Sequence, residues 1–223
     1  FFYYAGGVPA VMEEIKSMLH LDVMTVTGKT LGENLEELKA GGFYDKCDGY
    51  LKKWGLKRTD VIRTFEEPIG TDGTVAILRG NLAPEGSVVK HSAVPKEMFR
   101  AVLKAKPFDC EEDAIEAVIS RKIQPGDAVF IRYEGPKGSG MPEMFYTTEA
   151  ISSDPELGKT IALITDGRFS GASKGPAIGH VSPEAADGGP IALVEEDDLI
   201  RIDIPERVLE IIGVKGEELP KEE

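Results

Sequence analysis

The chain has 223 residues, of which 41% are hydrophobic and 29% charged, the composition of an ordinary globular protein with a sizeable core. It carries 26 basic and 39 acidic residues, and the resulting net charge of −13 argues against nucleic acid or an anionic membrane surface as a partner. No run of about 18 apolar residues occurs, so the sequence predicts no membrane-spanning helix.

The cysteine content and the first residues of the chain bear on its cellular location and on whether it is part of a longer protein. Cys47 and Cys110 are too few and too far apart for a disulfide scaffold or a four-cysteine zinc site, so a reducing, cytoplasmic location is expected. The chain opens on four aromatic residues, Phe1–Tyr4, without an initiator Met, which predicts a piece cut from a longer chain.

The first part of the chain reads as helical. Apolar residues at helical spacing predict a helix over 8–19. A second helix is expected to begin at Thr30, which forms a capping box with Glu33, and to stop at Gly41-Gly42. Residues 41–70 show no clear period and indicate a boundary between two structural units.

From Gly73 onward, short β-rich runs alternate with helical ones, which predicts a mixed α/β domain over about residues 70–215. Strands are expected at 74–78, 88–89, 128–133, 160–164, 191–194, 199–204 and 208–212, and helices at 112–119 and 142–152. The acidic tail, residues 217–223, is expected to be frayed and solvated.

Ser170 is the first candidate for chemistry. The apolar run Ile161–Ile164 reads as a short buried strand, and a polar, glycine-bearing turn holding Ser170 and Gly171 follows it. A hydroxyl at the mouth of a buried strand, flanked by glycine, can meet a substrate with little steric obstruction. The alternative is a serine that serves only turn hydrogen bonds, and Arg168 stands where a nucleophile elbow would need glycine.

Two more glycine-rich polar loops join the Ser170 turn as possible site-building segments, because loops on a rigid scaffold are where sites are usually built. They span residues 80–86 and 135–143. Glu143 is interpreted either as a ligand for a hard cation such as Mg²⁺ or as a surface carboxylate next to a helix start. Lys137 could bind a carboxylate or phosphate, or be a solvated loop lysine, and His91 and His180 are open between structural roles and a general base.

Several long strings resemble one family. Ala162-Leu-Ile-Thr-Asp-Gly-Arg-Phe-Ser-Gly171 and Gly179-His-Val-Ser-Pro-Glu-Ala185 look like the signature of the dihydroxyacid dehydratase / 6-phosphogluconate dehydratase family. Further strings occur in the family's order at 5–12, 25–30, 79–90, 133–143 and 188–192. The resemblance covers about residues 5–204, and several motifs in one order are far more specific than a single motif.

The resemblance implies the fold and activity of the carboxy-terminal part of a dehydratase. Residues 1–56 would be the helical end of a large, cluster-binding α/β domain, and 57–223 a swivelling, barrel-like β/β/α domain. The implied enzyme is a hydro-lyase that converts 2,3-dihydroxy acids to 2-keto acids in branched-chain amino acid biosynthesis. A sugar-acid (aldonate or phosphogluconate) dehydratase is the alternative, and a free-standing, non-catalytic binding domain is a second one.

The resemblance also implies roles for individual residues. Ser170 would be the base that takes the C2 proton, and Glu143 a Mg²⁺ ligand, while the ligands of an iron–sulfur cluster would lie outside this chain. Lys137, Arg168, Ser173 and His180 are further substrate or loop candidates. Ala172 departs from relatives that carry Thr there, and Ser173 could supply the hydroxyl. The chain alone is expected to be inactive, and the full-length protein a homodimer or tetramer.

Overall fold

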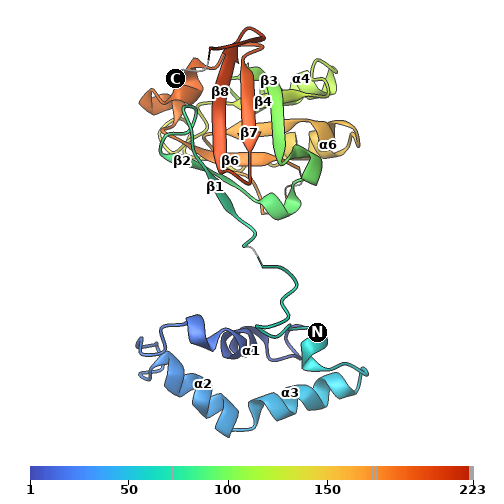
Figure 1. The fold of residues 1–223 in the computed structure, drawn as a ribbon, viewed down its shortest axis with the longest axis vertical. Coiled ribbons are helices and arrows are strands. Elements are labelled where there is room, and N and C mark those ends of the chain that lie inside the picture. The colour runs from blue at the N-terminus through green and yellow to red at the C-terminus, as the bar shows by residue number, and fades with distance from the viewer. Residues whose placement is uncertain (72, 172, 174, 221–223) are drawn as a thin grey trace. The chain divides into compact units, whose positions relative to one another are not determined.

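The computed structural model describes residues 1–71, 73–171, 173 and 175–220, and the chain divides into two compact units, Phe1–Asp72 and Gly73–Glu223 (Figure 1). Within the described residues, no helix has both the length and the apolar character needed to cross a membrane. Each unit has a hydrophobic core of its own.

The first unit consists of short helices, α1 (Gly7–Glu14), α2 (Leu31–Ala40) and α3 (Phe43–Lys52). The predicted capping box at the start of α2 is confirmed, because Glu33 N donates to Thr30 Oγ1 at 3.2 Å and Thr30 N to Glu33 Oε2 at 2.7 Å. Residues 41–70, which show no clear period in the sequence, contain α3, which buries Tyr44, Cys47 and Leu51 on one face.

In the residues that the structure describes, the second unit is a mixed sheet of nine strands with three α-helices. The strands are β1 (Ala76–Leu78), β2 (Gly86–Val89), β3 (Arg100–Phe108), β4 (Asp127–Ile131), β5 (Ala162–Thr165), β6 (Ala177–Ser182), β7 (Leu199–Asp203), β8 (Val208–Val214) and β9 (Glu217–Glu218). Their order is β1-β2-β6-β5-β4-β3-β7-β8-β9, with parallel pairing from β3 through β4 and β5 to β6 and antiparallel pairing elsewhere. The helices are α4 (Glu111–Ile119), α5 (Tyr146–Ser152) and α6 (Leu157–Thr160). The mixed α/β prediction is confirmed.

The sheet is buried on both faces at its parallel centre. Along β4, Ala128 and Phe130 point into the main core within the curl of the sheet, while Val129 and Ile131 pack against the helices outside it. The alternation of sides follows from the two-residue period of a strand, and burial of both faces explains why residues 128–131 of β4 are all apolar.

The curled sheet is joined between β1 and β8 into a half-barrel. Arg79 pairs with Val208, since Arg79 N donates to Arg207 O and Leu209 N to Arg79 O, both at 2.8 Å. The side-chain amide of Asn81 extends this join by exchanging hydrogen bonds of 2.8 and 2.7 Å with the backbone of Ile211. A glycine is required between them, because a Cβ at Gly80 would lie 2.2 Å from Leu209 O.

We therefore expect Gly80→Ala to lower the free energy of unfolding by about 3 kcal/mol through a clash with backbone. Gly126→Ala is the control, since Gly126 also has a positive φ of 93° but no atom within 4 Å of the added methyl, so only about 1 kcal/mol is expected. Urea unfolding followed by far-UV circular dichroism measures both values. Equal losses in the two variants would contradict a steric role at the join.

Three predicted elements differ in the structure. Residues 191–194 form a 3-10 turn (Pro190–Leu193) rather than a strand, because Arg132 Nη1 donates to Ala192 O and Val194 O at 3.0 Å and replaces a strand partner. The helix expected over 142–152 begins only at Tyr146, and the one expected over 8–19 ends at Glu14 and is followed by a 3-10 turn at Lys16–Met18.

Three stretches were not anticipated as strands. β3 carries charged residues and Pro107, and β6 contains Gly179 and His180, so neither shows a strand pattern on its own. The tail is not wholly frayed, because Glu217–Glu218 pair with β8 and Leu219 N donates to Ile212 O at 2.8 Å.

Candidate functional site

The Ser170 turn follows β5, as the sequence predicts, and folds back across the sheet. Because β5 pairs in parallel with β6, the chain after Thr165 must return along the strands before Ala177 can begin β6 beside Leu163. Two hydrogen bonds hold the start of the turn to β5 and β6: Gly167 N donates to Thr165 Oγ1 at 2.9 Å, and His180 N donates to Gly167 O at 2.8 Å.

Glu143 lies against the same turn. It forms a parallel bridge with Arg168, and Met144 N donates to Arg168 O at 3.1 Å. This pairing joins the backbone of the Glu143 loop to that of the Ser170 turn at one rim of the sheet, although the two loops follow different strands. The expectation that Glu143 stands next to a helix start was wrong, since α5 begins at Tyr146 and the Glu143 side chain is exposed beside Arg168 instead.

Asp166 fixes the base of this rim. Its carboxylate is 2% exposed and accepts three backbone hydrogen bonds, from Tyr133 N at 3.1 Å, Glu134 N at 3.0 Å and Ala185 N at 2.8 Å. A buried carboxylate is tolerated where its oxygens receive several donors, so Asp166 joins the ends of β4, β5 and β6. Sequence reasoning missed this residue, although Asp166 stands within the string that singled out Ser170.

Glu184 supports the loop that holds Glu143 by accepting backbone hydrogen bonds, as Asp166 does at the base of the rim. It is 7% exposed, and its Oε1 accepts Lys137 N at 2.8 Å and Gly138 N at 2.9 Å. The Lys137 ammonium is turned outward to Asp187, 2.5 Å away, and this hydrogen bond raises the pKa of Lys137. The structure thus places Lys137 at an exposed ion pair, outside the residues that line the Ser170 hollow.

A hollow of about 210 Å³ opens beside Ser170 on the face of β2 and β6 opposite to the main core. Its polar lining includes Lys90, Ser170, Ser173 and His180, and its walls are Thr74, Val75, Val88, Phe169, Gly171, Gly175, Ala177 and Gly179. Ser173 Oγ is buried there without a hydrogen-bond partner among the described residues. Ala172, singled out in the sequence, lies outside the described residues.

The two histidines have different surroundings. His180 lies in β6 with a left-handed φ of 55°, and it lines both the Ser170 hollow and a neighbouring one of about 470 Å³ that contains Glu85, Asp166 and Glu184. His91 is bonded through Nε2 to Gly73 O and meets Phe99 edge to face, with ring centroids 6.2 Å apart. His91 therefore has structural contacts, whereas His180 remains a candidate ligand-binding residue.

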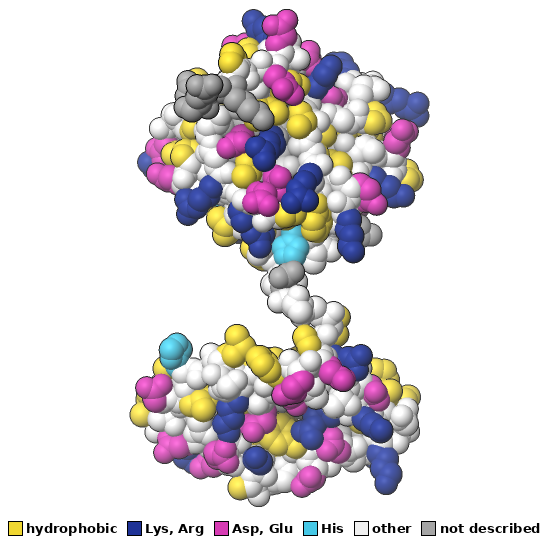
Figure 2. Space-filling model, in the orientation of Figure 1, with side chains coloured by type: hydrophobic (Ala, Val, Ile, Leu, Met, Phe, Trp, Pro, Cys, Tyr) yellow, Lys and Arg dark blue, Asp and Glu magenta, His cyan; other side chains and the backbone are white. Residues whose placement is uncertain are grey.

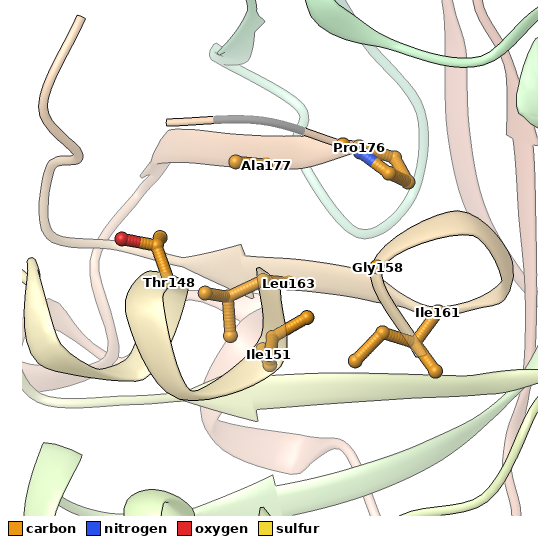
Figure 3. Close-up of a pocket in the computed structure, with 8 residues that line it drawn as sticks. Thr148, Ile151, Gly158, Ile161, Leu163, Pro176 and Ala177 are labelled. Atoms are coloured by element: carbon orange, nitrogen blue, oxygen red, sulfur yellow. The ribbon is translucent and has the colours of Figure 1, made fainter. Parts of the chain in front are cut away.

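A third hollow carries no comparable chemistry. Figure 3 shows Ile151, Ile161 and Leu163 beneath Pro176 and Ala177, in a crevice of only about 10 Å³. Thr148 is the polar side chain in this view, and its hydroxyl already donates to Phe145 O at 2.7 Å. This volume is about the least that holds one water molecule, so the crevice is a packing gap between the helices and the sheet.

Metal-binding capacity is limited among the described residues, where no group of three or more His, Cys, Asp or Glu side chains is placed to hold an ion. Glu143 offers a single exposed carboxylate, which suits a hard cation such as Mg²⁺ that takes one or two carboxylates and keeps several waters. Cys47 is buried, and burial raises the pKa of its thiol, while Cys110 lies in the other unit. These cysteines do not fit a cluster site.

Charged side chains of both signs are mixed on one face of the second unit. Figure 2 shows acidic and basic side chains interspersed over the visible face of residues 73–223.

Comparison with known proteins places the whole chain in one group. The family model described as dihydroxy-acid/6-phosphogluconate dehydratase C-terminal matches residues 60–223, and its N-terminal counterpart matches residues 1–34. A dihydroxy-acid dehydratase of Methanosarcina barkeri is 52% identical over 98% of this chain and 37% of its own length.

Other relatives give the same result. Dihydroxy-acid dehydratases of Solidesulfovibrio magneticus and Caldanaerobacter subterraneus are 54% and 50% identical, over 35% and 37% of their own lengths. The chain thus spans little more than a third of the length of these curated relatives. With the C-terminal family model covering all of the second unit, the chain belongs to the dihydroxy-acid/6-phosphogluconate dehydratase family.

Proposed function

We propose that this chain is the carboxy-terminal part of a hydro-lyase that removes water from 2,3-dihydroxy acids, with Ser170 as the base. The observation that carries the proposal is the backbone pairing of Glu143 with Arg168, which joins the loop that carries Glu143 to the turn that carries Ser170. This arrangement can hold a cation and a proton acceptor near the same substrate carbon.

In the proposed reaction, Ser170 Oγ in its alkoxide form takes the proton from C2, the C2–H electron pair forms the C2=C3 bond, and the C3 hydroxyl leaves as hydroxide. The hydroxide takes the proton back from Ser170 and departs as water, which regenerates the base, while the enol tautomerises to a 2-keto acid. A serine oxygen is an effective base only when a nearby cation stabilises its alkoxide form. Mg²⁺ held by Glu143 would neutralise the substrate carboxylate and so acidify the C2 proton. Ligands of an iron–sulfur cluster would come from the part of the relatives' length that this chain does not span.

The hollow supports a branched aliphatic dihydroxy acid over a sugar acid. Val75, Val88 and Phe169 offer apolar walls beside Ser170, which suit a short alkyl group. A sugar-acid dehydratase remains the alternative, because much of the substrate pocket would lie outside this chain.

For the full-length enzyme we expect kcat/KM to be at least about tenfold higher for a branched 2,3-dihydroxy acid than for an aldonic or phosphorylated aldonic acid. Steady-state assays with both substrate classes under the same conditions measure the ratio. A ratio in favour of the sugar acid would assign the alternative activity, and turnover of neither would favour a non-catalytic binding domain.

The proposal extends to the organisation of the full-length protein. Residues 1–56 would complete a cluster-binding domain, and 57–223 would form a swivelling domain that carries Ser170 and Glu143 to it. A cytoplasmic homodimer or tetramer is part of the same proposal.

A further inference from the structure

Lys90 connects two distant parts of the chain at the Ser170 hollow. It follows β2 directly, and its Nζ donates to Gly171 O at 2.7 Å, across 81 positions of sequence. Because the donor is an ammonium, this is a charge-assisted hydrogen bond, stronger than one between neutral groups. The acceptor belongs to the residue that directly follows Ser170, so the bond acts on the backbone that orients the Ser170 hydroxyl.

A second bond holds the same turn from the same segment. Gly175 N donates to Ala93 O at 3.1 Å, and between the two attachment points Ser173 N donates to Ser170 O at 3.1 Å. The Ser170 turn is thus fixed at Gly171 and Gly175 to residues 90–93, while its start is fixed to β6. Removal of the Lys90 bond would free the stretch nearest to the proposed base.

The charge of Lys90 is also placed to act on Ser170. Of the described residues that line this hollow, Lys90 is the only lysine or arginine. The other charged or titratable groups near the turn are Arg168 within it, Glu143 paired to Arg168, and His180 on β6. Lys90 is exposed, as are Arg168, Glu143 and His180, but the hydrogen bond to Gly171 O holds the Lys90 ammonium at the turn.

We propose that Lys90 is a positioning residue for Ser170: it fixes the turn through Gly171 and its positive charge favours the alkoxide form of Ser170. This inference rests on the proposed function. It supplies from this chain a second cationic group beside the base, in addition to any metal at Glu143.

The test uses the full-length holoenzyme with Lys90→Met, Lys90→Arg and the control Lys96→Met, which removes an exposed lysine outside the described lining of the hollow. Loss of a nearby cation destabilises the alkoxide and raises its pKa. The ascending limb of kcat against pH should therefore move up by about one unit in Lys90→Met. At neutral pH, kcat should fall at least about tenfold with a smaller change in KM, and Lys90→Arg should restore most of it.

A second readout does not depend on activity. In Lys90→Met, hydrogen–deuterium exchange at the Ser173 and Gly175 amides should be faster than in Lys96→Met. If the pH profile and exchange of Lys90→Met match the control while Ser170→Ala is inactive, the role of Lys90 is overturned and the proposed function stands. If Ser170→Ala retains activity, both are overturned.

Discussion

Ser170→Ala in the full-length enzyme is expected to lower kcat by about a thousandfold, because general acid–base groups contribute about 10² to 10⁴ in rate. Ser170 lies in a turn whose backbone is fixed by Gly167, Gly171 and Gly175, so the alanine variant should keep the fold and lose only the hydroxyl. Initial rates with a branched 2,3-dihydroxy acid measure the loss, and an unchanged circular dichroism spectrum shows that the protein is folded.

The matched control for this substitution is Ser153→Ala. Ser153 is an exposed serine just after α5, whose hydroxyl donates to Ala150 O at 2.7 Å, and its removal should leave kcat within about twofold of wild type. A Ser170→Ala enzyme that turns over as fast as Ser153→Ala would remove Ser170 from the reaction and leave it with a turn-forming role.

Asp166→Asn is expected to lower the free energy of unfolding of the second unit by about 3 kcal/mol. The Asp166 carboxylate uses both oxygens as acceptors for three backbone N–H groups and is 2% exposed. An asparagine keeps one oxygen and must turn its NH₂ group toward at least one of these donors, which leaves a buried N–H unpaired. The loop carrying Glu143 should loosen as well.

The measurement must follow the second unit directly. The single tryptophan of the chain, Trp54, lies in the first unit, so tryptophan fluorescence does not report on the unfolding of residues 73–223. Urea unfolding monitored by hydrogen exchange at the amides of β4 and β5 reports directly on that unit. Asp154→Asn is the control, since Asp154 is an exposed aspartate that also accepts backbone N–H bonds and should cost under about 1 kcal/mol. Equal losses of unfolding free energy in the two variants would show that the buried Asp166 carboxylate does not stabilise the second unit more than an exposed aspartate does.

Local sequence patterns correctly predict those elements whose structure depends only on neighbouring residues. The capping box of Thr30 and Glu33 needs only one helical turn, and the apolar run of β4 is buried whichever strands flank it. By contrast, residues 191–194 read as a strand, but the carbonyls of that segment bind Arg132, about 60 positions away. β6 becomes a strand because β2 and β5 pair with it on both sides.

The residues of the candidate site likewise fall into those that a local sequence pattern indicates and those that only the fold reveals. Ser170 and Glu143 stand in strings whose residue types already indicate chemistry, and the backbone pairing of Glu143 with Arg168 joins the two strings. Lys90 and Asp166 carry no such local signal, because their partners are 81 and about 33 positions away. Lys137, an apparent anion binder in sequence, pairs with Asp187, a partner that becomes evident only when both loops are folded.

The hollow beside Ser170 is walled in part by Thr74 and Val75, which precede the first strand of the sheet, and Gly73 is bonded to His91. A shortened protein that starts at Ala76 would keep every strand of the second unit and could fold to the same half-barrel, yet it would lack one side of the cavity. The smallest piece that folds and the smallest piece that can bind are therefore different lengths of chain. Grafts or domain exchanges that use this unit should carry residues 73–75 with it.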